Sequence, residues 1–150
     1  MTKEIDELQA EIGGTFDALI PTDYEWGYIF VEAGHDMPPT FWFCYKNTET
    51  GKIIPLDYLA KRKDIIVKDV NRYGDLKTNL FLLCLDLHEM YFKEFGKEWH
   101  TLTYKLNGNG TFDISLDYEK PQGSWDSRRN TWCMKHLGEI PRVTVDMLRE

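Results

Sequence analysis

The sequence has few cysteines, and their spacing fits no common framework. Only three occur in 150 residues, far apart from one another: Cys44, Cys84 and Cys133. An odd number at wide separations argues against a disulfide framework and against a cysteine zinc site. We therefore expect free, mostly buried thiols, and an inert Cys44 in particular, because apolar surroundings raise the pKa of a thiol.

Long apolar runs are also missing. No stretch approaches the roughly 20 apolar residues of a membrane helix. The first residues, MTKEIDELQAEI, are acidic and amphipathic and contain no apolar signal region. We expect a cytoplasmic protein without membrane contacts. A content of 42% hydrophobic and 14% aromatic residues is sufficient for a single domain over residues 1–150.

Basic residues are in the minority. There are 18 of them against 25 acidic residues, which gives a formal net charge of -7. This charge opposes association with phosphate backbones and favours cationic partners. Direct nucleic-acid binding is therefore not expected, whereas a basic protein partner suits the charge.

The usual spacings of catalytic and metal-binding residues are absent. The histidines are His35, His88, His100 and His136. None is paired at metal-ligand spacing, and His88-Glu89 lacks the second histidine of a zinc-protease helix. Asp113 and Asp117 would lie about 13 Å apart along a strand, too far for a glycosidase pair. The sequence predicts no catalytic residue, no metal ligand and no cofactor.

The clearest positive signal is a β-hairpin over residues 101–119. Two alternating runs flank the turn-forming sequence Asn-Gly-Asn-Gly. Only a register that sets Leu106 opposite Phe112 places both apolar sets on one face of the sheet. This register leaves a three-residue loop, in which Gly110 takes the positive φ angle that the turn requires.

The polar face of this hairpin becomes acidic toward its far end. This acidic face can be interpreted as a docking surface for a basic partner. The alternative, which the sequence leaves open, is an ordinary solvated face that binds no partner. Trp125 is expected in an exposed loop, where it is the best candidate for an interface anchor, since binding hot spots favour tryptophan. The predicted partner-binding residues are Asp113, Asp117, Glu119, Trp125 and Asp126.

The rest of the chain has helical and strand patterns in a simple order. Apolar spacings of three and four predict helices over residues 3–20, 69–95, 125–137 and, more briefly, 143–148. Aromatic and β-branched runs predict strands at 24–33, 40–46 and 52–56. The order indicates an α+β fold, with an antiparallel sheet of about five strands and helices packed mainly on one face.

Glycines and prolines interrupt these patterns at three places. Gly13-Gly14 lies inside the first helix, which we expect to depend on packing and to bend there. Gly74 is expected to separate a short lead-in from the helix that ends at Gly96. The first two strands are expected to be joined by a loop over residues 34–39, stiffened by Pro38-Pro39.

Several short motifs follow one another in a fixed order. They are Ile20-Pro21, the aromatic strand from Trp26 to Val31, Phe41-Trp42-Phe43-Cys44-Tyr45-Lys46, Trp99 followed by Leu102-Thr103-Tyr104-Lys105-Leu106, Gly110-Thr111-Phe112, Asp117-Tyr118-Glu119, Arg128-Arg129, Trp132, Leu137-Gly138 and Pro141. In this order and spacing, nearly the whole chain resembles the YezG-like family of bacterial immunity proteins.

The resemblance implies a cytoplasmic antitoxin. Such a protein binds the toxic C-terminal domain of a cognate toxin, commonly a nuclease, that is exported by type VII secretion with an LXG-type leader. It needs no cofactor, and we expect a monomer when free or a 1:1 complex with the toxin. The charge agrees, because a nuclease groove is basic. The family does not supply interface residues, since members discriminate among toxins. Gly13-Gly14 and the Pro38-Pro39 loop depart from the family pattern.

Two other classes of function stay open. A small enzyme with a carboxylate or histidine site would place His35 and a second titratable group in a deep cleft. A structural subunit of a larger assembly would expose a broad apolar patch.

Overall fold

The computed structural model describes residues 2–56 and 70–141. Its elements are α1 (Thr2–Leu19), β1 (Tyr24–Gly34), β2 (Met37–Asn47), β3 (Ile53–Pro55), α2 (Val70–Phe95), β4 (Thr101–Asn107), β5 (Phe112–Asp117) and α3 (Trp125–Leu137). The predicted helix at 143–148 lies outside the described residues. None of the described helices combines the length and the apolar character needed to cross a membrane.

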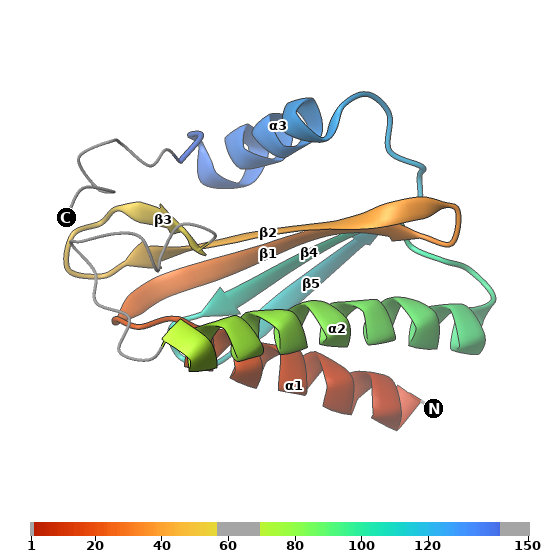
Figure 1. Ribbon diagram of the computed structural model, residues 1–150, viewed down its shortest axis with the longest axis horizontal. Helices are drawn as coiled ribbons and strands as arrows, with labels where there is room; N and C mark the ends of the chain where they lie inside the picture. The colour runs from red at the N-terminus through yellow and green to blue at the C-terminus, as the bar shows by residue number, and fades with distance from the viewer. Residues whose placement is uncertain (1, 57–69, 142–150) are drawn as a thin grey trace.

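The strands form one antiparallel sheet in the order β3-β2-β1-β4-β5. The predicted α+β fold class is therefore confirmed. Figure 1 shows α1 and α2 side by side on one face of the sheet and α3 on the other. Two of the three described helices thus share a face, while the third gives the sheet a second, smaller covered face.

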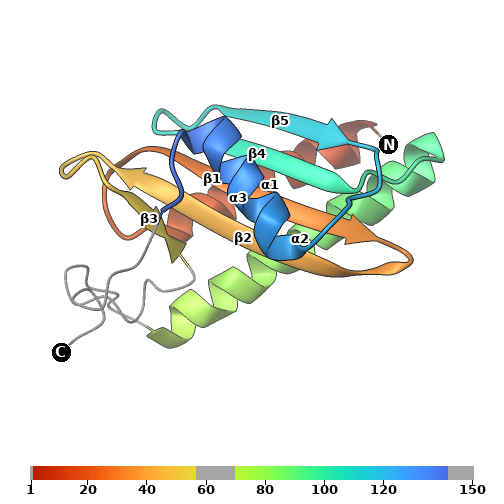
Figure 2. The same cartoon turned by 90° about the horizontal axis from the view of Figure 1, so that it is seen from above.

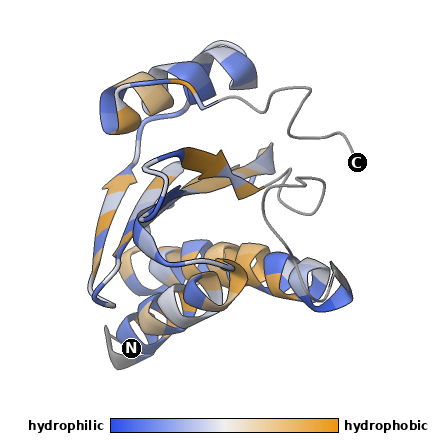
Figure 3. Cartoon of the chain, turned by 90° about the vertical axis from the view of Figure 1, so that its left-hand side faces the viewer, coloured by the Kyte–Doolittle hydropathy of each residue, from blue (hydrophilic) through white to orange (hydrophobic). Residues whose placement is uncertain are grey.

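The main core lies between the sheet and the α1/α2 layer. The helical spacing of α1 buries one stripe, as predicted from the sequence. In Figure 3 each helix carries both hydrophobic and hydrophilic residues, as expected for helices with one face on a sheet. The helix residues buried in this core include Ile5, Leu8, Ile12, Phe16, Leu19, Leu80, Leu83, Cys84 and Leu87.

The second core lies beneath α3. Phe30 of β1 stacks on Trp132, with ring centroids 5.0 Å apart and planes 11° apart. Trp132 also donates a hydrogen bond from Nε1 to Thr103 Oγ1 at 2.9 Å. Figure 2 shows α3 lying across the strands of the sheet. The predicted bounds of this helix are confirmed, with Ser124 accepting a hydrogen bond at its start and Gly138 in the left-handed conformation at its end.

The predicted hairpin is confirmed in its register. Leu106 pairs with Phe112, and Lys105 pairs with Asp113 on the opposite face. Gly110 has a φ angle of 91°, as the three-residue loop requires. The alternation of apolar and polar residues therefore determines which side chains reach the α3 face of the sheet.

The connection between β1 and β2 differs from the prediction. A two-residue turn, His35-Asp36, joins the strands, with Gly34 opposite Met37. Pro38-Pro39 belongs to β2, so the expected long, stiff loop is wrong. β3 pairs only with residues 44–46 of β2, and prolines are tolerated where a strand has a free edge, because no hydrogen bond is lost there. The lead-in predicted before Gly74 is also wrong, since α2 runs through it without a break.

Candidate functional site

A groove of about 440 Å³ runs along α3 on the face of the sheet that this helix covers. One side is formed by α3, and the other by the ends of β4 and β5 with the chain that follows β5. Acidic and basic side chains share this groove. Its lining residues are Phe30, Glu32, Thr101, Asp117, Glu119, Lys120, Pro121, Gln122, Ser127, Arg128, Thr131, Trp132 and Lys135.

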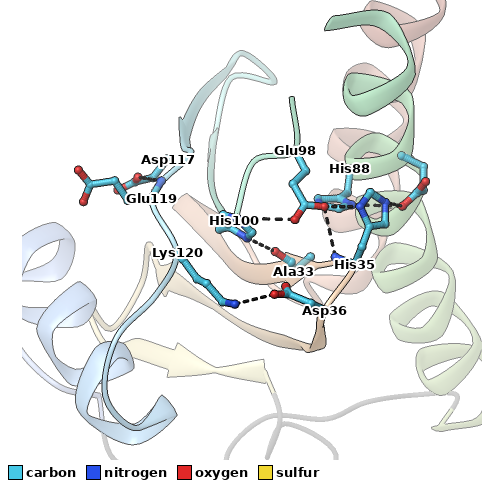
Figure 4. A network of polar contacts seen from close by, with 10 residues as sticks. Ala33, His35, Asp36, His88, Glu98, His100, Asp117, Glu119 and Lys120 are labelled. Carbon is cyan, nitrogen blue, oxygen red and sulfur yellow. Dashed lines mark hydrogen bonds and ion pairs between the residues drawn. The ribbon is translucent and has the colours of Figure 1, made fainter. Parts of the chain in front are cut away.

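Two of the predicted partner-binding residues meet at the rim of this groove. Asp117 is the last residue of β5, and its side-chain carboxylate accepts a hydrogen bond of 2.8 Å from the backbone N–H of Glu119. Glu119 lies beyond the end of β5. Its position is therefore determined by this local turn and not by the alternation of side chains along the strand. Figure 4 shows both carboxylates at one side of the polar network. Both residues are exposed.

Asp113 and Asp126 contribute negative charge outside the lining of the groove. Asp113 is exposed in the middle of β5, opposite Lys105. Asp126 projects from the first turn of α3 with 80% of its side chain exposed, 3.8 Å from Arg129 Nη2. The four predicted acidic residues therefore lie on the α3 side of the sheet, and two of them line the groove.

Trp125 does not occupy the exposed loop that was predicted. It is the first residue of α3, is half-buried, and stacks on Phe30 with ring centroids 5.2 Å apart. The side chain packs α3 against the sheet, because Phe30 of β1 presents its aromatic ring on this face. A direct role of Trp125 in partner binding stays a prediction.

The floor of the groove holds an ion pair that sequence reasoning missed. Glu32 of β1 is only 1% exposed, and Arg128 of α3 donates to both of its carboxylate oxygens at 2.7 Å. Arg128 also donates to the backbone carbonyls of Gln122 and Gly123. The available signal was Glu32 itself, which directly follows the apolar residues 28–31 of β1, because a buried charge requires a counterion.

The basic residues of the groove are partly neutralised within the protein. Lys120 pairs with Asp36 at 2.5 Å, which lowers the pKa of Asp36 and raises that of Lys120. Arg128 is neutralised by Glu32, whose hydrogen bonds raise the pKa of the guanidinium. The carboxylates at the rim are therefore the part of the groove best suited to a cationic partner.

A second polar cluster lies at the turn between β1 and β2 (Figure 4). His35 contacts carboxylates on both sides, Glu89 of α2 and Glu98 of the α2–β4 connection. Burial raises the pKa of Glu89, but hydrogen bonds from His35 and His88 outweigh it and lower the pKa overall. His35 is 45% exposed, so the cluster is at the surface and not in the deep cleft expected for an enzyme.

The thiols are as predicted. Cys44, Cys84 and Cys133 are free and buried. Burial raises the pKa of all three thiols, in the case of Cys133 to about 11. A thiolate nucleophile is therefore disfavoured at each position.

Comparison with known proteins identifies the class. A family model described as immunity protein YezG-like matches residues 5–149. The chain thus belongs to the YezG-like family of immunity proteins, as the order of its motifs indicated. Immunity protein YezG of Bacillus spizizenii is 26% identical to it over 144 residues, which cover 94% of this chain and 87% of that protein.

Proposed function

We propose that this protein binds and neutralises the toxic C-terminal domain of a cognate LXG toxin exported by type VII secretion, and that this domain is a nuclease. The family match over residues 5–149 is the observation that carries the proposal. The protein acts in the cytoplasm as a single domain, and it needs no cofactor and no catalytic residue of its own. A net charge of -7 supports a cationic partner, because a nuclease must present basic residues to its substrate.

The proposed contact surface is the acidic rim of the groove, Asp117 and Glu119, together with Asp113 of β5 and the neighbouring first turn of α3. Asp113 and Asp117 belong to β5, whose register is fixed by pairing along β4. The hydrogen bond from the Glu119 backbone N–H to the Asp117 carboxylate fixes the turn that carries Glu119. The backbone that carries these carboxylates is therefore ordered before binding, which reduces the entropy lost on association. Electrostatic complementarity of this kind accelerates encounter and discriminates against acidic proteins.

The two alternative functions have weaker support. The enzyme alternative required His35 in a deep cleft, whereas this side chain is at the surface. The structural-subunit alternative required one broad apolar patch. Within residues 2–56 and 70–141, the exposed large apolar residues lie on both sides of the sheet, and they are Leu82, Phe92, Phe95, Tyr118 and Met134.

Co-expression tests the proposal directly. Cells that produce the toxic domain encoded beside this protein should survive when this protein is present and die when it is absent. The purified proteins should elute together from gel filtration as a 1:1 complex. An inactivated toxic domain serves as the binding partner when the active form cannot be purified. Death at the same rate with and without this protein, and separate elution, would contradict the proposal for that toxin.

Reversing the charge of the rim should slow association. We expect the variant carrying Asp117→Lys and Glu119→Lys to associate about 10-fold more slowly at low salt, with a smaller dependence on ionic strength, because steering by opposite charge is lost. Stopped-flow or surface-based kinetics at several salt concentrations measures both effects.

A control with the same change in net charge separates local from global electrostatics. Glu49→Lys with Asp75→Lys reverses two exposed acids outside the lining of the groove, one in the β2–β3 turn and one on α2. This control should retain most of the association rate. Equal rates for the rim variant and the wild type would exclude the rim as the contact surface while leaving the immunity function intact.

A further inference from the structure

Histidine and glutamate side chains from three separate segments converge at one end of the sheet. His35 is in the β1–β2 turn, His88 and Glu89 are near the end of α2, and Glu98 and His100 precede β4. Figure 4 shows His35 between α2 and the strand layer. The backbone holds this arrangement, because Ala33 N–H donates to the His100 carbonyl at 3.0 Å and His100 Nδ1 contacts the Ala33 carbonyl at 3.0 Å.

Three of these residues offer ligand atoms to one point. The atoms provided by His35, His88 and Glu89 all lie within 4.8 Å of one another. His35 Nε2 is 2.7 Å from Glu89 Oε1, and His88 Nδ1 is 3.4 Å from the same oxygen. Ligands around tetrahedral zinc are roughly 3.4 Å apart, since each metal–ligand bond is about 2.1 Å. His35 and Glu89, whose side chains are 45% and 52% exposed, would have to move slightly apart to match this spacing.

His88 is the buried member of the three. The residue is only 4% exposed, and its Nε2 has no hydrogen-bond partner. Glu98 Oε2 is the nearby acceptor, at 3.8 Å, beyond hydrogen-bond distance. A buried polar nitrogen without a partner is costly. The proposed ligand atom is the other ring nitrogen, Nδ1, which is 3.4 Å from Glu89 Oε1. A metal there would keep the proton on Nε2, on the side of the ring that faces the Glu98 carboxylate, without itself pairing that nitrogen.

Glu98 has the position of an outer-shell carboxylate. It contacts His35 Nδ1 and accepts a hydrogen bond of 3.2 Å from the His35 backbone N–H. This contact leaves His35 Nε2 directed toward Glu89. A carboxylate on the far nitrogen of a histidine is the usual support for a metal-binding imidazole, because it fixes the tautomer and the ring orientation.

We infer that His35, His88 and Glu89 form a binding site for a divalent transition-metal ion, with Zn²⁺ as the preferred ion and Glu98 orienting His35. Two imidazoles and one carboxylate are a characteristic zinc set, in which water completes the coordination. Imidazole ligands select against Mg²⁺ and Ca²⁺, which prefer oxygen. The ion would join the β1–β2 turn to α2 and so stabilise the fold. This inference does not depend on the proposed toxin.

Metal titration of the tag-free, full-length protein after chelator treatment tests the site. Calorimetry with Zn²⁺ should show one ion per chain, and Co²⁺ should give the visible absorption of a low-symmetry, four-coordinate site. Zn²⁺ should also raise the melting temperature. Mg²⁺ at the same concentration should produce neither effect.

Substitutions of His35 and Glu89 can separate loss of metal binding from loss of folding, because both side chains are exposed. His35→Gln and Glu89→Gln should each abolish stoichiometric Zn²⁺ binding while circular dichroism stays that of the wild type. Glu98→Gln should weaken binding about 10- to 100-fold, as expected for an outer-shell partner. His136→Gln changes a histidine of α3, outside the cluster, and should bind Zn²⁺ like the wild type.

Two results would overturn the inference. One is a wild type that binds Zn²⁺ no more tightly than His35→Gln does. The other is loss of stoichiometric binding in His136→Gln with retention in Glu89→Gln, which would place the ion elsewhere on the protein.

Discussion

Replacing Arg128 with alanine is expected to lower the free energy of unfolding by about 3 kcal/mol. The substitution removes both 2.7 Å hydrogen bonds to Glu32 and leaves that carboxylate buried in β1 without a counterion. An unpaired buried charge is costly because little water reaches it. Arg128 itself is 21% exposed, so the loss belongs at the lower end of the range for buried pairs. Urea unfolding monitored by tryptophan fluorescence gives the value.

The neighbouring arginine is a matched control. Arg129 pairs with the exposed Asp126 at 3.8 Å, and Arg129→Ala should cost less than about 1 kcal/mol, as for other exposed pairs. Glu32→Leu combined with Arg128→Met should recover most of the stability lost in Arg128→Ala, because an apolar pair leaves no charge buried. A loss in Arg128→Ala as small as that in Arg129→Ala would show that the ion pair does not hold α3 to the sheet.

Local patterns were sufficient to predict the fold class and the hairpin. Alternation along β4 and β5 and the glycine-rich turn allow one register, because a one-residue slip would expose the whole apolar set. Local patterns also predicted the bounds of α3, because Ser124 and Gly138 are typical residues for the start and the end of a helix. These features depend on residues that are close in sequence, so their geometry follows from short-range chemistry.

The candidate sites depend on contacts that sequence spacing does not encode. Glu32 and Arg128 are 96 residues apart, and His35 meets Glu89 across 54 residues. Histidine spacing along the chain predicted no metal ligand. The inferred site instead combines residues of α2 with the β1–β2 turn, which spacing along the chain does not relate. Trp125 was expected to be exposed because it was placed in a loop. Its burial depends on how α3 packs against β1, which the local sequence does not reveal. Tertiary placement therefore determines which charged and aromatic residues are available to a partner.

Gly13→Ala is expected to destabilise the protein by about 1–3 kcal/mol, although alanine is the better helix former by about 1 kcal/mol. A Cβ atom on Gly13 would lie 2.6 Å from Tyr104 Oη. Tyr104 has little room to move, because it is fully buried, stacks on Phe112 and donates a 2.9 Å hydrogen bond to the Gln9 carbonyl. Thermal or urea unfolding measures the change.

Gly14 provides the opposite case one residue along α1. No atom lies within 4 Å of its added Cβ, so Gly14→Ala should stabilise the protein by about 0.5–1 kcal/mol through helix propensity and the unfolded chain. Adding Tyr104→Phe should reduce the cost of Gly13→Ala, because the hydroxyl is the atom that clashes. Stabilisation by alanine at both glycines would mean that helix propensity alone governs these positions of α1. Opposite signs would show that close packing against β4 requires the glycine at position 13.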